Sequence, residues 1–146
     1  MGEELKYGHR HGGKVAVPVA MAASQVLSAQ SGKFVYMNAG AATLNVDGTA
    51  TVFGFLEAHA HTPATGAVLN CIIDLTGIFR IPVNSGTFVI GMVGDLCDIS
   101  IASDIQGAQL AASTEDTLIV VGGSAAVYVD VMMNPSKFGT GLGVDA

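Results

Sequence analysis

Hydrophobic positions along this chain come in short runs that turn-forming residues interrupt. Between about residue 15 and residue 135, runs rich in Val, Ile, Phe and Thr alternate with Gly, Asn, Asp, Pro or Ser. This composition and spacing are typical of strands joined by turns. The predicted strands cover residues 14–20, 33–37, 43–46, 50–58, 67–74, 78–83, 87–90, 95–101, 108–112, 117–121 and 125–133.

A two-residue period supports this prediction in two of the runs. In residues 127–131 every second position is valine, and in residues 96–101 Cys97, Ile99 and Ile101 alternate with their neighbours. Successive side chains of a strand point to opposite faces, whereas a helix repeats every 3.6 residues. The sequence therefore predicts an all-β protein that forms a compact β-sandwich or barrel.

The two ends of the chain differ from this β domain of residues 15–135. Residues 1–14 are polar, carry half of the Lys and Arg residues, and include the glycine pair Gly12–Gly13. They predict an extended, flexible N-terminal arm that becomes ordered where a partner supplies contacts. Residues 136–146 are rich in glycine and predict a C-terminal tail without regular structure.

Composition and charge exclude several classes of protein. With 146 residues the chain suits one domain, and 50% hydrophobic against 12% charged residues is opposite to the composition of disordered proteins. Because no run approaches the roughly 20 apolar residues of a spanning helix, no membrane partner is expected. The net charge of −6 argues against a nucleic-acid partner. So many apolar residues favour self-association, with a homotrimer as the expected state.

Cys71 and Cys97 are the two cysteines of the chain, and each lies inside an apolar run. The spacing contains no CxxC pair of the kind used in zinc ribbons or thioredoxin-like motifs. We therefore expect both thiols to be buried, reduced and poorly reactive.

The histidines supply the one candidate metal site. On a strand, Glu57, His59 and His61 would share a face and could converge on a metal ion. This is half of a cupin-type site, but no histidine follows His61 to complete it. A solvated loop is the alternative interpretation, and we expect no bound metal.

Motifs for other enzyme chemistry are also missing from the sequence. There is no G-x-S-x-G nucleophile elbow, and the glycines of residues 139–143 lack the strand-to-helix context of a phosphate loop. The sequence therefore predicts a protein that is not an enzyme and that holds no cofactor.

One run resembles a known family. Gly94-Asp95-Leu96-Cys97-Asp98, within residues 91–99, is similar to the Gly-Asp-hydrophobic-x-Asp strand of tailed-bacteriophage head decoration (cement) proteins. Similar patterns occur in residues 53–58, 76–83, 111–121 and 127–135, so the resemblance covers most of residues 50–135.

The resemblance implies a β-tulip-like domain and a structural role in the virion. Such proteins are made in the host cytoplasm and bind the outer surface of the capsid, commonly as trimers at local threefold positions. There they bridge subunits of the major capsid protein against the internal pressure of the DNA. Bridging contacts of this kind are multivalent, which makes the loss of any one subunit harder.

The polar arm is the segment expected to contact the capsid or another partner, because an extended segment can add a strand to a neighbouring sheet edge. The expected contact residues are Lys6, Tyr7, His9, Arg10, His11 and Lys14. Two alternatives stay open: a small cupin-type enzyme that binds metal through His59 and His61, and another structural component of the virion.

Overall fold

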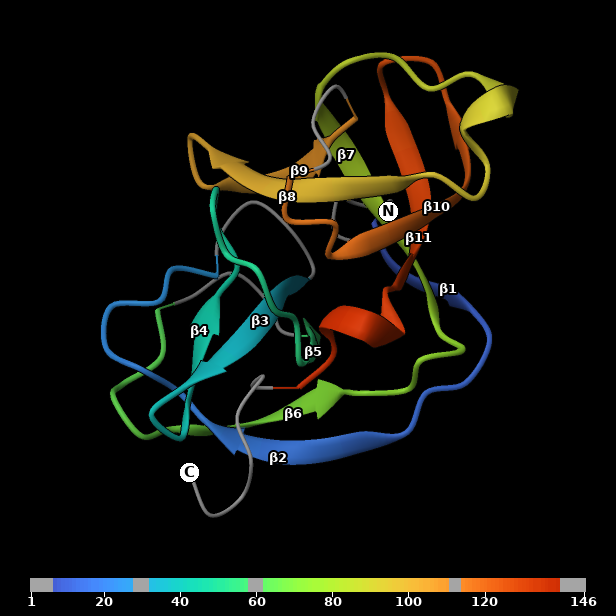
Figure 1. Cartoon of the computed structure of the whole chain (residues 1–146). Helices are drawn as coiled ribbons and strands as arrows, with labels where there is room; N and C mark the ends of the chain where they lie inside the picture. Colours follow the sequence, from blue (N-terminus) through green and yellow to red (C-terminus); the bar gives the residue numbers. More distant parts are fainter. Residues whose placement is uncertain (1–6, 28–31, 58–61, 111–113, 140–146) are drawn as a thin grey trace.

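The computed structural model describes residues 7–27, 32–57, 62–110 and 114–139. The described residues form eleven strands in two sheets and contain no α-helix (Figure 1). The six-stranded sheet occupies the upper half of Figure 1 and the five-stranded sheet the lower half. The arrangement is sandwich-like, so the all-β prediction is confirmed, and of its two forms the structure has the sandwich and not a closed barrel.

The larger sheet has the order β1-β7-β11-β10-β8-β9. Its strands are β1 (Gly8–His11), β7 (Ile78–Ser85), β8 (Leu96–Ala102), β9 (Ile105–Gln109), β10 (Leu118–Ser124) and β11 (Tyr128–Met133). One edge of β7 pairs with β11. The other edge pairs with β1 near residue 79 and with β9 near residue 84, and this additional pairing curls the sheet.

The smaller sheet has the order β2-β6-β5-β3-β4. Its strands are β2 (Ala16–Ala20), β3 (Gly32–Asn38), β4 (Ala41–Leu44), β5 (Gly54–Glu57) and β6 (Val68–Ile72), all antiparallel. A bridge between Met21 and Ala42 brings the two ends of this sheet together. Two short 3₁₀ turns complete the described elements, η2 (Ile90–Met92) and η3 (Pro135–Lys137).

The main core lies between the sheets, where the alternating pattern places the apolar face of each strand. In β11, Val129, Val131 and Met133 are buried while the residues between them are half-buried. Phe34 and Phe55 of the smaller sheet meet Phe79 of the larger one, with ring centroids 4.7–5.3 Å apart. This aromatic cluster joins the two layers.

A second core packs against the opposite face of the smaller sheet. It contains Val19, Met21, Leu27, Val35, Ala42, Leu44, Leu56 and Cys71. Because both faces of this sheet are covered, β3 and β5 are buried at consecutive positions, residues 32–35 and 54–56, instead of alternating.

Two polar side chains bridge the sheets at buried positions. Gln106 in β9 donates from Nε2 to the carbonyl oxygens of Phe34 and Asn45, at 2.9 and 3.0 Å, and its Oε1 accepts from the Phe34 N–H at 2.6 Å. Lys33 Nζ donates to the carbonyl oxygens of Val26 at 3.0 Å and Asp104 at 2.6 Å. These bonds fix the relative position of segments far apart in the sequence.

Several sequence predictions differ from the structure. Residues 136–138, predicted as part of a tail without regular structure, belong to η3 and to a bridge between Val52 and Phe138. Residues 8–11, predicted as part of an unpaired arm, form β1 because the His9 ring packs edge-on against Phe79. The predicted strand 87–90 reduces to one bridge at Phe88 followed by η2. The strand predicted at 108–112 begins earlier, because residues 105–107 already belong to β9. The strand predicted at 117–121 is longer than expected, because β10 continues to residue 124.

The cysteine prediction is confirmed in its structural part, because Cys71 and Cys97 are free thiols and both are buried. Burial raises the pKa of each thiol to about 12, and at Cys97 the carboxylates of Asp98 and Asp116 add to the effect. Native thiols should therefore react slowly with maleimide at pH 8.

Alkaline pH should destabilise the fold through these thiols. Between pH 9 and 12 the unfolded chain releases thiol protons that the folded chain retains, so stability is full below pH 9 and falls as pH rises. The expected slope is about 1.4 kcal/mol per pH unit for each thiol. Urea denaturation at pH 8, 9.5 and 10.5 measures it, with a Cys71→Ala/Cys97→Ala variant as control. Equal pH slopes in the two proteins would contradict the assignment.

Candidate interaction surface

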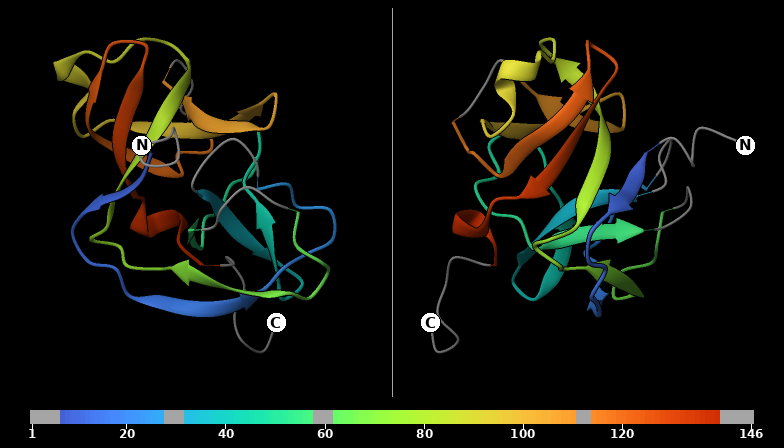
Figure 2. Two further views of the ribbon diagram at one scale, coloured as in Figure 1. Left: turned by 180° about the vertical axis from the view of Figure 1, so that it is seen from behind. Right: turned by 90° about the vertical axis from the view of Figure 1, so that its right-hand side faces the viewer.

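Four of the eight exposed large apolar side chains of the described residues, including the most exposed one, lie in residues 88–96, which we call the apolar loop. The exposed fraction is 80% for Ile90, 56% for Val89, 48% for Val93 and 38% for Leu96. The loop contains η2, which projects from the end of the larger sheet as the yellow turn in Figures 1 and 2. An exposed apolar cluster at a projecting turn marks an interaction site better than the same residues scattered singly.

The apolar loop is held in place by backbone hydrogen bonds at both of its ends. The Phe88 N–H donates to the Ala125 carbonyl at 2.8 Å. At the other end, the Gly94 N–H donates to the Val120 carbonyl, and the Val120 N–H donates to the Asp95 carbonyl, both at 2.8 Å. The loop is therefore an extension of the larger sheet, with its apolar side chains presented in a fixed position.

The apolar character continues from the loop onto the outer face of the larger sheet. Leu96 is opposite Ile119 of β10, and Ile119 is opposite Met132 of β11, so the three side chains form a row across three strands. Val127, in the turn that follows β10, is 47% exposed and lies next to the strand-like bridge at Phe88. The loop and this row together form an apolar surface made of several side chains on the outside of the larger sheet.

The predicted contact residues of the N-terminal segment lie on and beside β1, except Lys6, which is outside the described residues. His9 Nε2 lies 3.0 Å from the Gly13 carbonyl oxygen, and its ring contacts Phe79 at a centroid distance of 5.5 Å. His11 is exposed, whereas Tyr7 and Arg10 are half-buried. Lys14 Nζ pairs with Glu57 Oε1 at 2.9 Å. His9 therefore has a packing role, while His11 remains open to a partner.

Of the candidate metal ligands, the structure describes Glu57 and not His59 or His61. Glu57 ends β5, and its carboxylate is engaged by Lys14. Across residues 7–27, 32–57, 62–110 and 114–139, no group of three or more His, Cys, Asp or Glu residues is arranged to hold a metal ion.

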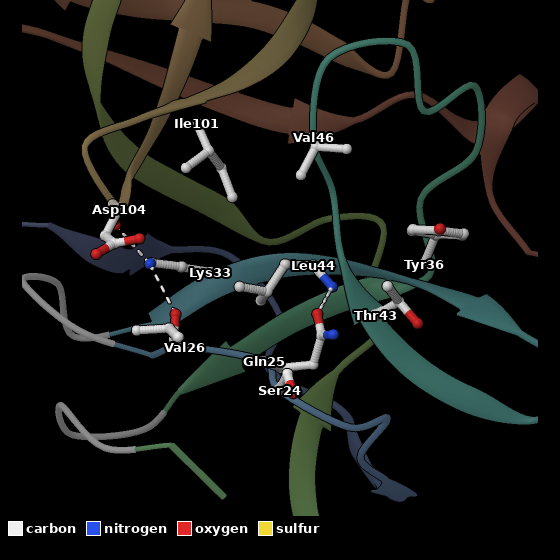
Figure 3. A pocket seen from close by; sticks show the side chains of 10 residues that line it. All are labelled: Ser24, Gln25, Val26, Lys33, Tyr36, Thr43, Leu44, Val46, Ile101 and Asp104. Carbon is white, nitrogen blue, oxygen red and sulfur yellow. Dashed lines mark hydrogen bonds between the residues drawn. The ribbon is translucent and has the colours of Figure 1, made fainter.

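A pocket of about 290 Å³ opens beside β3 and β4 (Figure 3). Its lining includes Ser24, Gln25, Val26, Lys33, Tyr36, Thr43, Leu44, Val46, Ile101 and Asp104. Burial lowers the pKa of Lys33, and the nearby Asp104 carboxylate partly offsets this shift. The amine is already bound by two backbone carbonyls, and Gln25 Oε1 accepts from the Leu44 N–H at 2.8 Å. The polar groups here thus bind strands and loops of the protein itself.

Sequence reasoning missed both the exposed loop and the buried lysine. The first part of the loop falls in the predicted strand 87–90, because its residues are apolar and include β-branched side chains. Lys33 precedes Phe34 and Val35 in an otherwise apolar strand, and this isolated charge was the available signal for a buried, bonded amine.

Comparison with known proteins identifies no family: no protein-family model matches the chain, and no curated protein sequence is significantly similar to it. None of the described residues lies in a helix that is long and apolar enough to cross a membrane.

Proposed function

We propose that this chain is a structural protein of a tailed-phage virion that binds the outside of the capsid and bridges subunits of the major capsid protein. The observation that carries the proposal is the apolar loop, which projects from the larger sheet and presents Ile90 at 80% exposure. The resemblance of residues 91–99 to the decoration proteins involves the same segment.

The energetics of the apolar loop favour a protein partner. Burying an aliphatic side chain contributes about 1.5–3 kcal/mol, so leaving Val89, Ile90 and Val93 in water forgoes several kcal/mol that a partner can recover. The centres of protein interfaces are apolar and depleted in charge. Residues 88–94 contain no charged residue, and the exposed Asp95 that follows them lies at the margin of the apolar loop.

The rigid attachment of the loop supports the same role. Its backbone is bonded to β10 and to the turn after β10, so little conformational entropy is lost when it docks. A preformed contact of this kind suits a protein that must hold capsid subunits in one arrangement.

The partners in this proposal are the major capsid protein and further copies of the chain, as a homotrimer. Several weak contacts made at once by a trimer give a much slower release than one contact. The side chains of Tyr7, Arg10, His11 and Lys14 would add polar contacts at the β1 edge of the larger sheet, away from the apolar loop. The net charge of −6 keeps such an outer-surface protein from binding DNA.

Replacing Ile90 with aspartate should weaken capsid binding at least tenfold, because a charge would enter the apolar centre of the interface. The thermal unfolding midpoint should change by no more than about 2 °C, since Ile90 is exposed in the free protein. The measurement is co-sedimentation with capsids that lack the chain, using Val68→Asp as a control at a valine of β6 that is 66% exposed.

Two results would contradict the proposal. One is equal binding by the wild type, Ile90→Asp and Val68→Asp, which would separate the apolar loop from capsid binding. The other is binding of the wild type to tails and not to heads, which would assign the chain to another part of the virion.

A further inference from the structure

Strand β1 is the first described strand of the chain and lies at an edge of the larger sheet. Its pairing with β7 is short, with Gly8 opposite Arg80, His9 opposite Phe79 and His11 opposite Ile78. The register is irregular between His9 and His11, so the ladder is interrupted within its own length. One side-chain contact of this pairing is His9 against Phe79. When β1 leaves the sheet it uncovers Phe79, and β1 of a second copy can cover this ring again.

The connection from β1 to β2 is a short, sharply bent hinge. Gly12 has φ +80°, and a Cβ added there would lie 1.9 Å from the Thr76 carbonyl oxygen. A Cβ at Gly13 would lie 2.0 Å from Asp74 Oδ2, while the Gly13 N–H donates to Thr76 Oγ1 at 3.0 Å. Only glycine can therefore adopt the bent form, whereas any residue can adopt an extended hinge.

We propose that β1 exchanges between copies of this chain: residues 8–11 leave their own β7 and pair with β7 of a second copy when the hinge extends. The occupant is a second copy because β1 fits the edge of β7 near Phe79, and every copy presents that same edge. Exchange keeps the pairing and the His9–Phe79 contact, now between chains. Swapping an identical element is a low-cost route to oligomers.

The short hinge favours exchange over closure. Residues 12–15 separate β1 from β2, and four extended residues span about 14 Å. The bent form depends on glycine at residue 12, whereas the extended form needs no residue with positive φ. In a cyclic oligomer each β1 would fill the edge that its neighbour has vacated, so no β7 edge remains open.

This inference goes beyond the proposed function, since exchange needs no capsid. It is tested by disulfide trapping between singly substituted chains. His11→Cys and an affinity-tagged Ile78→Cys are mixed at high concentration, incubated and oxidised. The two new cysteines are partners in the β1–β7 register, and they can meet only if β1 of one chain lies on β7 of the other. The native thiols are buried and remain reduced.

The control is a mixture of His11→Cys with tagged Val83→Cys, because Val83 pairs with β9 and not with β1. We expect at least fivefold more covalent heterodimer from the matched pair than from this control. The double variant His11→Cys/Ile78→Cys shows whether the pair geometry permits a disulfide. If the disulfide forms within one chain of the double variant, while the matched mixture gives no more heterodimer than the control, exchange is refuted.

A hinge substitution adds a second readout. Gly12→Val disfavours the bent hinge, so it should raise the heterodimer yield of the matched pair at least twofold. An unchanged or lower yield would contradict the role of the hinge. Because both measurements use purified chain alone, loss of capsid binding would leave this inference standing, and failure of exchange would leave the capsid proposal standing.

Discussion

Replacing Gln106 with leucine is expected to lower the free energy of unfolding by about 3–6 kcal/mol. The side chain is fully buried and satisfies three backbone groups: the Phe34 N–H, the Phe34 carbonyl and the Asn45 carbonyl. Leucine is similar in size but bonds with none of them. Each buried group left without a partner costs about 1–3 kcal/mol, and a domain has about 5–15 kcal/mol in total.

Gln109→Leu is the matched control, since Gln109 lies in the same strand and is half-buried. Urea denaturation of the two variants and the wild type measures the difference. A loss below about 1 kcal/mol in Gln106→Leu would show that β9 does not depend on this bridge to the smaller sheet.

Replacing Phe79 with alanine is expected to lower the free energy of unfolding by about 3–5 kcal/mol. Its ring is fully buried and contacts Phe34 and Phe55 of the other sheet at 5.3 and 4.7 Å, so the substitution leaves a cavity where the sheets meet. It also removes the ring that His9 packs against. Hydrogen exchange should therefore show reduced protection of the β1 amides at denaturant concentrations where the core is intact.

The matched control for Phe79→Ala is Phe138→Ala. Phe138 is half-buried and stacks on Phe53 at the edge of the core, with ring centroids 5.7 Å apart. Phe138→Ala should lower the free energy of unfolding clearly less than Phe79→Ala does. Equal costs for the two variants would show that the sheets are not joined principally through the Phe34–Phe55–Phe79 cluster.

Most of the strands could be predicted because the β pattern is local. Two local patterns, the period of two in residues 127–131 and the apolar run 67–74, arise because one or both faces of a sheet are buried. Burial of this kind is visible in the sequence itself. Strand β1 could not be predicted in this way. Its residues Gly8–His11 are polar or small, and their strand conformation depends on β7, which lies about 70 positions further along the chain.

The candidate surface shows a different limit of sequence reasoning. Val89 and Ile90 have the composition of a core strand, and only the three-dimensional fold shows that they point into solvent. Lys33 shows the reverse case, because a charged residue is buried where Val26 and Asp104 bring two carbonyl oxygens to its amine. Both outcomes depend on contacts distant in sequence, which a single sequence does not record.

The position of the chain in the particle tests the central claim most directly. Under the proposed function, electron cryo-microscopy of a virion that contains this chain should show it on the outer surface of the capsid, between neighbouring subunits of the major capsid protein. Density for Ile90 and Val93 should lie against a capsid subunit. A virion whose capsid surface lacks this chain, or carries it with the apolar loop facing solvent, would contradict the account.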